Sequence, residues 1–214
     1  MNPSNRRDAI KSIASAAAGV ALVGSDSLSQ VPTVQIGGYP FELTLTTVTS
    51  QTVRITLQPI ESGQPSPVLN DGALLRTDWA VPALRWRPIA GTRHVKCGNL
   101  TINVSAKPFA IRVMRKDARL VQELKLDTAT GKLTFLLGDA PVLALGQGGV
   151  QFDRRGSIDS MGNGQGAYRL ATHGARVPVQ FAIGTAGWAM YIHQPLGTFD
   201  LTANEELCVA PLIT

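Results

Sequence analysis

The chain has 214 residues, of which 44% are hydrophobic and only 16% are charged, which argues against disorder over most of its length and suits one globular domain. Its 21 glycines and 13 prolines favour many turns and short strands over long helices. The net charge is +5, but the basic residues are scattered and form no stripe with interleaved aromatic residues, so we expect no nucleic-acid partner.

The first 30 residues are typical of an export signal. A twin arginine, Arg6-Arg7, precedes a short stretch of small apolar residues, Ile13–Val23. This pattern resembles a twin-arginine signal, and the stretch is shorter than the roughly 20 residues of a membrane span. An amphipathic helix on the domain is the alternative, but the stretch offers no defined packing face. We expect a signal and linker at 1–30, the domain at 31–214, a periplasmic or extracellular location and no stable membrane span.

From about Val31 apolar and polar residues alternate, which is the period-two pattern of half-buried antiparallel strands. The predicted strands are Phe41–Val48, Thr52–Leu57, Arg93–Cys97, Leu100–Val104, Phe109–Met114, Leu120–Leu126, Leu133–Leu137, Val177–Ile183 and Trp188–His193. Turn residues separate many of them at intervals of roughly 8–12 residues, as in sandwiches and barrels. We therefore predict an all-β fold, an antiparallel β-sandwich.

The proline-rich segment Pro59–Gly91 is long for a structureless loop, so we expect it to pack on the sheet or to contain a short strand. It carries Trp79 and Trp86. Flat aromatic faces suit sugar rings, so an exposed Trp would make a stand-alone carbohydrate-binding module an alternative function. Burial in the core is the other interpretation of both residues.

The two cysteines, Cys97 and Cys208, have no Cys or His partner at metal-ligand spacing. Either they form a disulfide in an oxidising compartment or they are two small buried side chains. We expect neither a metal nor a cofactor.

Two segments resemble a known family. Leu-Gly-Gln-Gly-Gly at 145–149 leads to Phe-Asp-Arg-Arg-Gly at 152–156, and the hairpin 177–193 carries Trp188 at its turn. Together they resemble the N-terminal, galactose-mutarotase-like β-sandwich (supersandwich) domain of glycoside hydrolase family 31, although Gln147 stands where that family usually has Glu. The resemblance covers about 100–201. It implies a domain that packs beside a catalytic barrel of the same polypeptide and does not carry its chemistry.

The segment after the second motif is the candidate binding loop. In the family this stretch often reads Trp-Asn-x-Asp and reaches the sugar pocket, but this chain lacks the Trp and the Asp. The resemblance leaves Asn163, Gln165 and His173 as candidate substrate-binding residues, with a glycine-rich turn as the alternative. The implied ligand is an α-linked oligosaccharide or glycoside.

We assign no catalytic residue to this chain. A retaining glycosidase needs two carboxyl groups about 5–5.5 Å apart, and the resemblance implies that both lie on the barrel, for which a chain of this length has no room. Asp153 and its arginine neighbours suit an ion-paired turn. An aldose-epimerase-like enzyme using His173 and His193 is a rival interpretation. We expect the chain to be inert alone and the protein to continue beyond Thr214.

Overall fold

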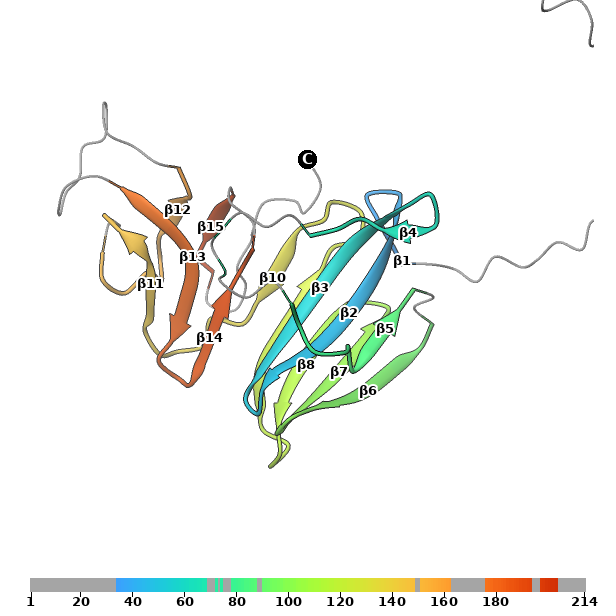
Figure 1. Cartoon of the computed structure of the whole chain (residues 1–214). Helices are drawn as coiled ribbons and strands as arrows, with labels where there is room; N and C mark the ends of the chain where they lie inside the picture. The colour runs from blue at the N-terminus through green and yellow to red at the C-terminus, as the bar shows by residue number, and fades with distance from the viewer. Residues whose placement is uncertain are drawn as a thin grey trace, which may run out of the picture. The chain divides into compact units, whose positions relative to one another are not determined.

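The computed structural model describes residues 34–68, 72, 74, 78–87, 90–148, 151–162, 176–193 and 197–203. They lie in the second of two units of the chain, Val31–Thr214. They form fifteen strands in four antiparallel sheets, and this described part of the chain contains no helix (Figure 1). The predicted all-β antiparallel fold is confirmed.

Two five-stranded sheets form the sandwich. The first sheet contains β1 (Val34–Ile36), β2 (Tyr39–Thr49), β3 (Thr52–Glu61), β4 (Gln64–Pro65) and β5 (Leu84–Trp86). The second contains β6 (Thr92–Cys97), β7 (Leu100–Ala106), β8 (Phe109–Arg115), β9 (Leu120–Leu126) and β10 (Leu133–Phe135). In the first sheet β2 is central, with β3 on one side and β1 and β5 sharing the other. The second sheet is a meander, in which each strand pairs with the next.

The alternation of the sequence explains the core of the sandwich. Along β2, Phe41, Leu43 and Leu45 point to one side of the sheet and are buried. From the facing sheet, Ile102 and Val104 of β7 belong to the same cluster of buried residues. The two sheets therefore share one hydrophobic core, which is the defining feature of a sandwich.

The remaining five strands form two small sheets around a second core. The strands are β11 (Val142–Gln147), β12 (Ile158–Ser160), β13 (Val177–Gly184), β14 (Trp188–Tyr191) and β15 (Thr198–Asp200), ordered β11-β13-β14 and β12-β15. Their shared core contains Phe135, Leu137, Val142, Leu145, Met161, Ala182, Phe199 and Leu201. Leu124 and Leu133 pack against both cores, so the smaller group lies beside the sandwich (Figure 1).

Trp188, which follows the turn of the β13–β14 hairpin, packs against the second core. It pairs with Gly184 across the hairpin, and a Cβ atom on Gly184 would lie 2.1 Å from the indole ring. The ring meets Phe135 edge-on, with the ring centroids 5.6 Å apart. The hairpin strands are not fully buried: three alternate residues of β13 are exposed, and no residue of β14 is fully buried.

All nine predicted strands are present, with small changes at their ends: β3 continues to Glu61, and β10 already ends at Phe135. The segment Pro59–Gly91 contributes two short strands, as the prediction allowed: β4 pairs with β3, and β5 pairs with β2. β1, β11, β12 and β15 were not predicted from alternation. Three of these strands are only three residues long, which is too short to show a period.

Candidate functional site

The candidate binding residues Asn163, Gln165 and His173 lie outside the described residues, so their assignment stays a prediction. The structure does describe both ends of the segment that carries them. The chain enters segment 163–175 just after Met161 and leaves it at Arg176. The described part of the candidate site consists of the residues that hold these two ends.

Strand β11 has an irregular backbone next to the start of β13. Ala144, Leu145 and Gly146 have φ values of 78°, 60° and 86°. The pairing register with β13 shifts at this point, between Ala144 and Gly146. Left-handed conformations are uncommon for residues other than glycine. Such a distortion interrupts the regular ladder, so its carbonyl groups need other hydrogen-bond donors.

Two buried arginines supply those donors. Arg154 donates from Nε to the Ala144 carbonyl at 2.9 Å and from Nη2 to the Gly146 carbonyl at 3.1 Å. Arg176 donates from Nη1 to the Gln147 carbonyl at 2.8 Å. Arg154 is 7% exposed and Arg176 is 2% exposed. We refer to Arg154 and Arg176 as the arginine pair; it supports the irregular part of β11 from within the protein.

Arg176 also joins the two ends of segment 163–175. Its Nη2 atom donates to both carboxylate oxygens of Asp159, at 2.8 and 2.7 Å. The same atom lies 3.7 Å from the sulfur of Met161. Asp159 is on β12, which precedes the segment, whereas Arg176 immediately precedes β13, which follows it. One buried ion pair thus fixes where the chain enters and leaves the candidate loop.

The arginine pair carries more positive charge than Asp159 balances. Burial lowers the pKa of Arg154; the charge of Asp159 acts in the opposite direction, and the charge of Arg176 lowers the pKa further. Within the described part of the chain, Arg154 Nη1 and Arg176 Nε are buried without a hydrogen-bond partner. Buried donors of this kind are costly, so the arrangement tolerates little change at either arginine.

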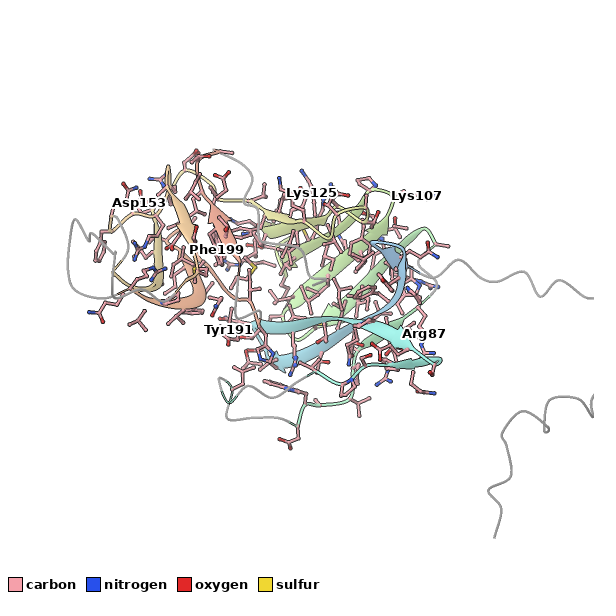
Figure 2. The ribbon with its side chains drawn as sticks, turned by 90° about the horizontal axis from the view of Figure 1, so that it is seen from above. Arg87, Lys107, Lys125, Asp153, Tyr191 and Phe199 are labelled. Carbon is pink, nitrogen blue, oxygen red and sulfur yellow. The ribbon has the colours of Figure 1, made fainter. Side chains whose placement is uncertain are left out.

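Asp153 and Arg155 form the ion-paired turn that the sequence predicted. Arg155 donates to Asp153 from Nη2 at 2.7 Å and from Nε at 3.0 Å, and the Val142 amide donates to Asp153 at 3.0 Å. Figure 2 shows Asp153 in the smaller group of strands, away from Arg87 and Lys107 on the sandwich. The side-chain hydrogen bond from Arg155 is the main cause that lowers the pKa of Asp153 to about 2, with burial acting in the opposite direction.

This lowered pKa predicts a loss of stability in acid. The folded-state pKa lies below the unfolded value of about 3.9, so the interaction stabilises the fold above that pH and is lost as the pH falls toward 2. The Asp153 side chain is 35% exposed, and solvent screening reduces the effect to about 1 kcal/mol. In urea titrations, Asp153→Asn is expected to be less stable than the parent chain at about pH 5 and to approach it near pH 2. A stability difference that does not change with pH would contradict this assignment.

The two tryptophans of the proline-rich segment differ in burial, and for Trp86 the interpretation as a core residue is confirmed. Trp86 is 4% exposed and belongs to the sandwich core, so the interpretation of Trp86 as a sugar platform is wrong. Trp79 is half-buried, and the Arg54 guanidinium lies 4.5 Å from the centroid of its ring. Cation–π contact of this kind explains how a loop Trp is anchored on the sheet.

The other expectations concern single residues. Cys97 has no disulfide partner among the described residues and is fully buried in the sandwich core, whereas Cys208 lies outside these residues. His193 stacks on Tyr191 with their ring centroids 6.2 Å apart. The described residues contain no cluster of three or more His, Cys, Asp or Glu side chains suited to a metal, and no helix among them is long and apolar enough to cross a membrane.

Sequence reasoning missed the roles of Asp159 and Arg176. Arg154 and Arg155 are adjacent, yet one is buried against β11 and the other makes the outer ion pair. A turn has no period that would show which arginine points inward. Arg176 is a single charge directly before a long apolar strand, and that position is the one sequence signal that could have indicated a buried cation.

Comparison with known proteins agrees with this fold. No protein-family model matches the sequence, and no curated protein matches it. Two solved structures of a glycoside hydrolase family 31 dextranase from Flavobacterium johnsoniae resemble the chain. One is a mutant complexed with isomaltotriose, at 16% identity, and the other is complexed with glucose, at 17% identity; both have a TM-score of 0.60.

Each match covers 80% of this chain and 22% of the dextranase chain. The chain therefore spans about a fifth of the length of these structures. At such low identity the likeness concerns the fold, and it extends over most of the present chain. The fold of this protein resembles that of part of a family 31 glycoside hydrolase.

Proposed function

We propose that this chain is the non-catalytic, N-terminal β-sandwich domain of an α-glycoside hydrolase related to family 31. The observation that carries the proposal is the fold shared with about a fifth of a family 31 dextranase. In this proposal the domain packs on a catalytic barrel of the same polypeptide. Its segment 163–175 contributes to the wall of the sugar pocket, with Asn163, Gln165 and His173 as candidate contacts to an α-linked oligosaccharide or glycoside.

The ion pair at the ends of the segment supports this role. A loop that lines a pocket must be presented in a defined place, and functional loops are usually held by a rigid scaffold. Here the scaffold is Asp159 bonded to Arg176, with Arg176 also bonded to the Gln147 carbonyl. A buried, multiply bonded arginine restricts both ends of the loop in a way that a short surface contact would not.

The test compares the 214-residue chain with the complete polypeptide that its gene encodes. We expect the chain alone to show no turnover of aryl α-glucosides and the complete polypeptide to hydrolyse them. Robust turnover by the chain alone would contradict a non-catalytic role. A reading frame that encodes no barrel after Thr214 would contradict the assignment to a larger hydrolase.

Export is a further part of the proposal and rests on Arg6-Arg7 and the apolar stretch that follows. The twin-arginine route and a periplasmic or extracellular location are expected. Replacing both arginines with lysine should leave the precursor in the cytoplasm, as judged by cell fractionation. Equal export of the two forms would contradict this route.

A further inference from the structure

One side of β13 is apolar and exposed. Val177, Val179 and Phe181 are 52%, 44% and 36% exposed. They alternate along the strand and therefore project from the same side of the sheet. Ala182 and Gly184 project from the other side and are buried, and Ala182 belongs to the second core. The strand thus has Ala182 and Gly184 buried on one side, where Pro178 and Gln180 are half-buried, and an apolar outer side.

The neighbouring strands extend this surface. Phe181 pairs with Tyr191 of β14, and Ile183 pairs with Leu143 of β11, so all four side chains lie on the outer side of the sheet. We call this surface the apolar face; it consists of Val177, Val179, Phe181, Ile183, Leu143 and Tyr191. None of these side chains carries a charge at neutral pH.

The outer side of another sheet in the same molecule shows the contrast. On the meander β6–β10, Arg112 bonds to Glu123 at 2.6 Å, and Lys125 lies 3.7 Å from the same carboxylate. On the neighbouring strands, His94 and Asn103 are joined at 2.7 Å. This is the usual polar surface of a sheet that faces water. A row of exposed Val and Phe indicates a surface that another protein surface covers.

We propose that the apolar face is the surface on which the catalytic domain of the same polypeptide docks. This inference rests on the proposed function. Val177 directly follows Arg176, so the apolar face begins where segment 163–175 ends. A body that receives this segment in its pocket must therefore lie next to the first residues of β13. The matched part is 22% of the dextranase chain, so most of a polypeptide of that kind lies outside this domain.

Hydroxyl-radical labelling read by mass spectrometry tests the proposal, with the 214-residue chain and the complete polypeptide labelled in parallel. We expect labelling of Val179 and Phe181 to fall several-fold in the complete polypeptide. Val81 and Tyr39 are the control residues, a Val and an aromatic residue outside β11–β15. They are 90% and 61% exposed, so both are labelled readily. Their labelling should be equal in the two proteins.

The possible outcomes separate this inference from the proposed function. Equal labelling of Phe181 in both proteins, in a complete polypeptide that hydrolyses α-glucosides, would overturn the docking surface and leave the proposed function standing. Protection that appears in the 214-residue chain as its concentration rises would assign the apolar face to a second copy instead. A complete polypeptide without a catalytic domain would overturn both.

A substitution in the apolar face provides a second test of the docking proposal. Val179→Glu places a charge on a half-exposed position, so the chain itself should still fold. In the complete polypeptide it should restore labelling of Phe181, whereas Val81→Glu should not. Continued protection of Phe181 in Val179→Glu would count against docking through this face.

Discussion

Replacing Arg176 with methionine is expected to lower the free energy of unfolding by about 3–5 kcal/mol, because the buried Asp159 carboxylate loses its partner. The two residues are 2% and 8% exposed, so water cannot readily replace the guanidinium. The change also removes the donor to the Gln147 carbonyl. Urea denaturation measures the loss, which is large compared with the roughly 5–15 kcal/mol that stabilise a typical domain.

Two controls separate the buried charge from other effects. The double variant Arg176→Met with Asp159→Leu should recover part of the loss, since an apolar replacement of a whole buried pair is often close to neutral. Arg112→Met breaks a pair of similar length, 2.6 Å, in which the arginine is 57% exposed. It should cost no more than about 1 kcal/mol. A loss below that value in Arg176→Met would refute the role assigned to the ion pair.

Arg176→Met should also have a local effect, which the global free energy of unfolding does not measure. If Arg176 holds the two ends of segment 163–175, its loss should release Asp159 and the start of β13 from each other under native conditions. Trypsin cleavage after Arg169 should then accelerate more than the change in global unfolding explains. Arg112→Met should leave this cleavage rate unchanged. Equal acceleration in the two variants would mean that the ion pair does not act on the segment.

The sandwich could be predicted from the sequence because its strands obey a simple period. The alternation of Phe41, Leu43 and Leu45 marks one side of β2, and these residues are buried as predicted. The expectation of a half-buried strand is wrong for β2, because Glu42, Thr44 and Thr46 on its other side are buried too. Trp86 could not be placed in the same way. It lies on a three-residue strand within a proline-rich segment, and its burial results from pairing with Leu43 of β2 rather than from any local pattern.

The site was harder to predict because its important features interrupt the period. From the sequence, residues 145–149 were assigned to a glycine-rich motif and not to a strand. In the structure they belong partly to β11, whose regular backbone is interrupted by the left-handed residues Ala144 and Leu145. The carbonyl groups released there explain why buried arginines are needed, and this need appears only once β11 and β13 are side by side. The family resemblance pointed to segment 145–156. It did not give the physical reason why Gly146 and Arg154 occupy their positions, which is the close approach of β11 to β13.

The close approach of β11 to β13 predicts that replacing Gly146 will lower the free energy of unfolding strongly. A Cβ atom there would lie 2.1 Å from the Val177 carbonyl oxygen and 2.6 Å from the Val179 nitrogen. Both are backbone atoms of β13, so no side-chain rotation can relieve the clash. Gly146→Ala is therefore expected to cost about 1–2 kcal/mol for its φ of +86° and about 1–3 kcal/mol more for displacing the strands, measured by urea denaturation.

Gly156→Ala is the matched control, because Gly156 has a φ of +73° but no atom within 4 Å of a built Cβ. Its free energy of unfolding should fall only by the cost of the positive φ, about 1–2 kcal/mol. Similar losses in the two variants would show that the approach of β13 to Gly146 is not tight. A larger loss at Gly146 should be accompanied by faster cleavage at Arg169. Moving β11 away from β13 pulls the Gly146 carbonyl from Arg154 and shifts the start of the strand that Arg176 anchors.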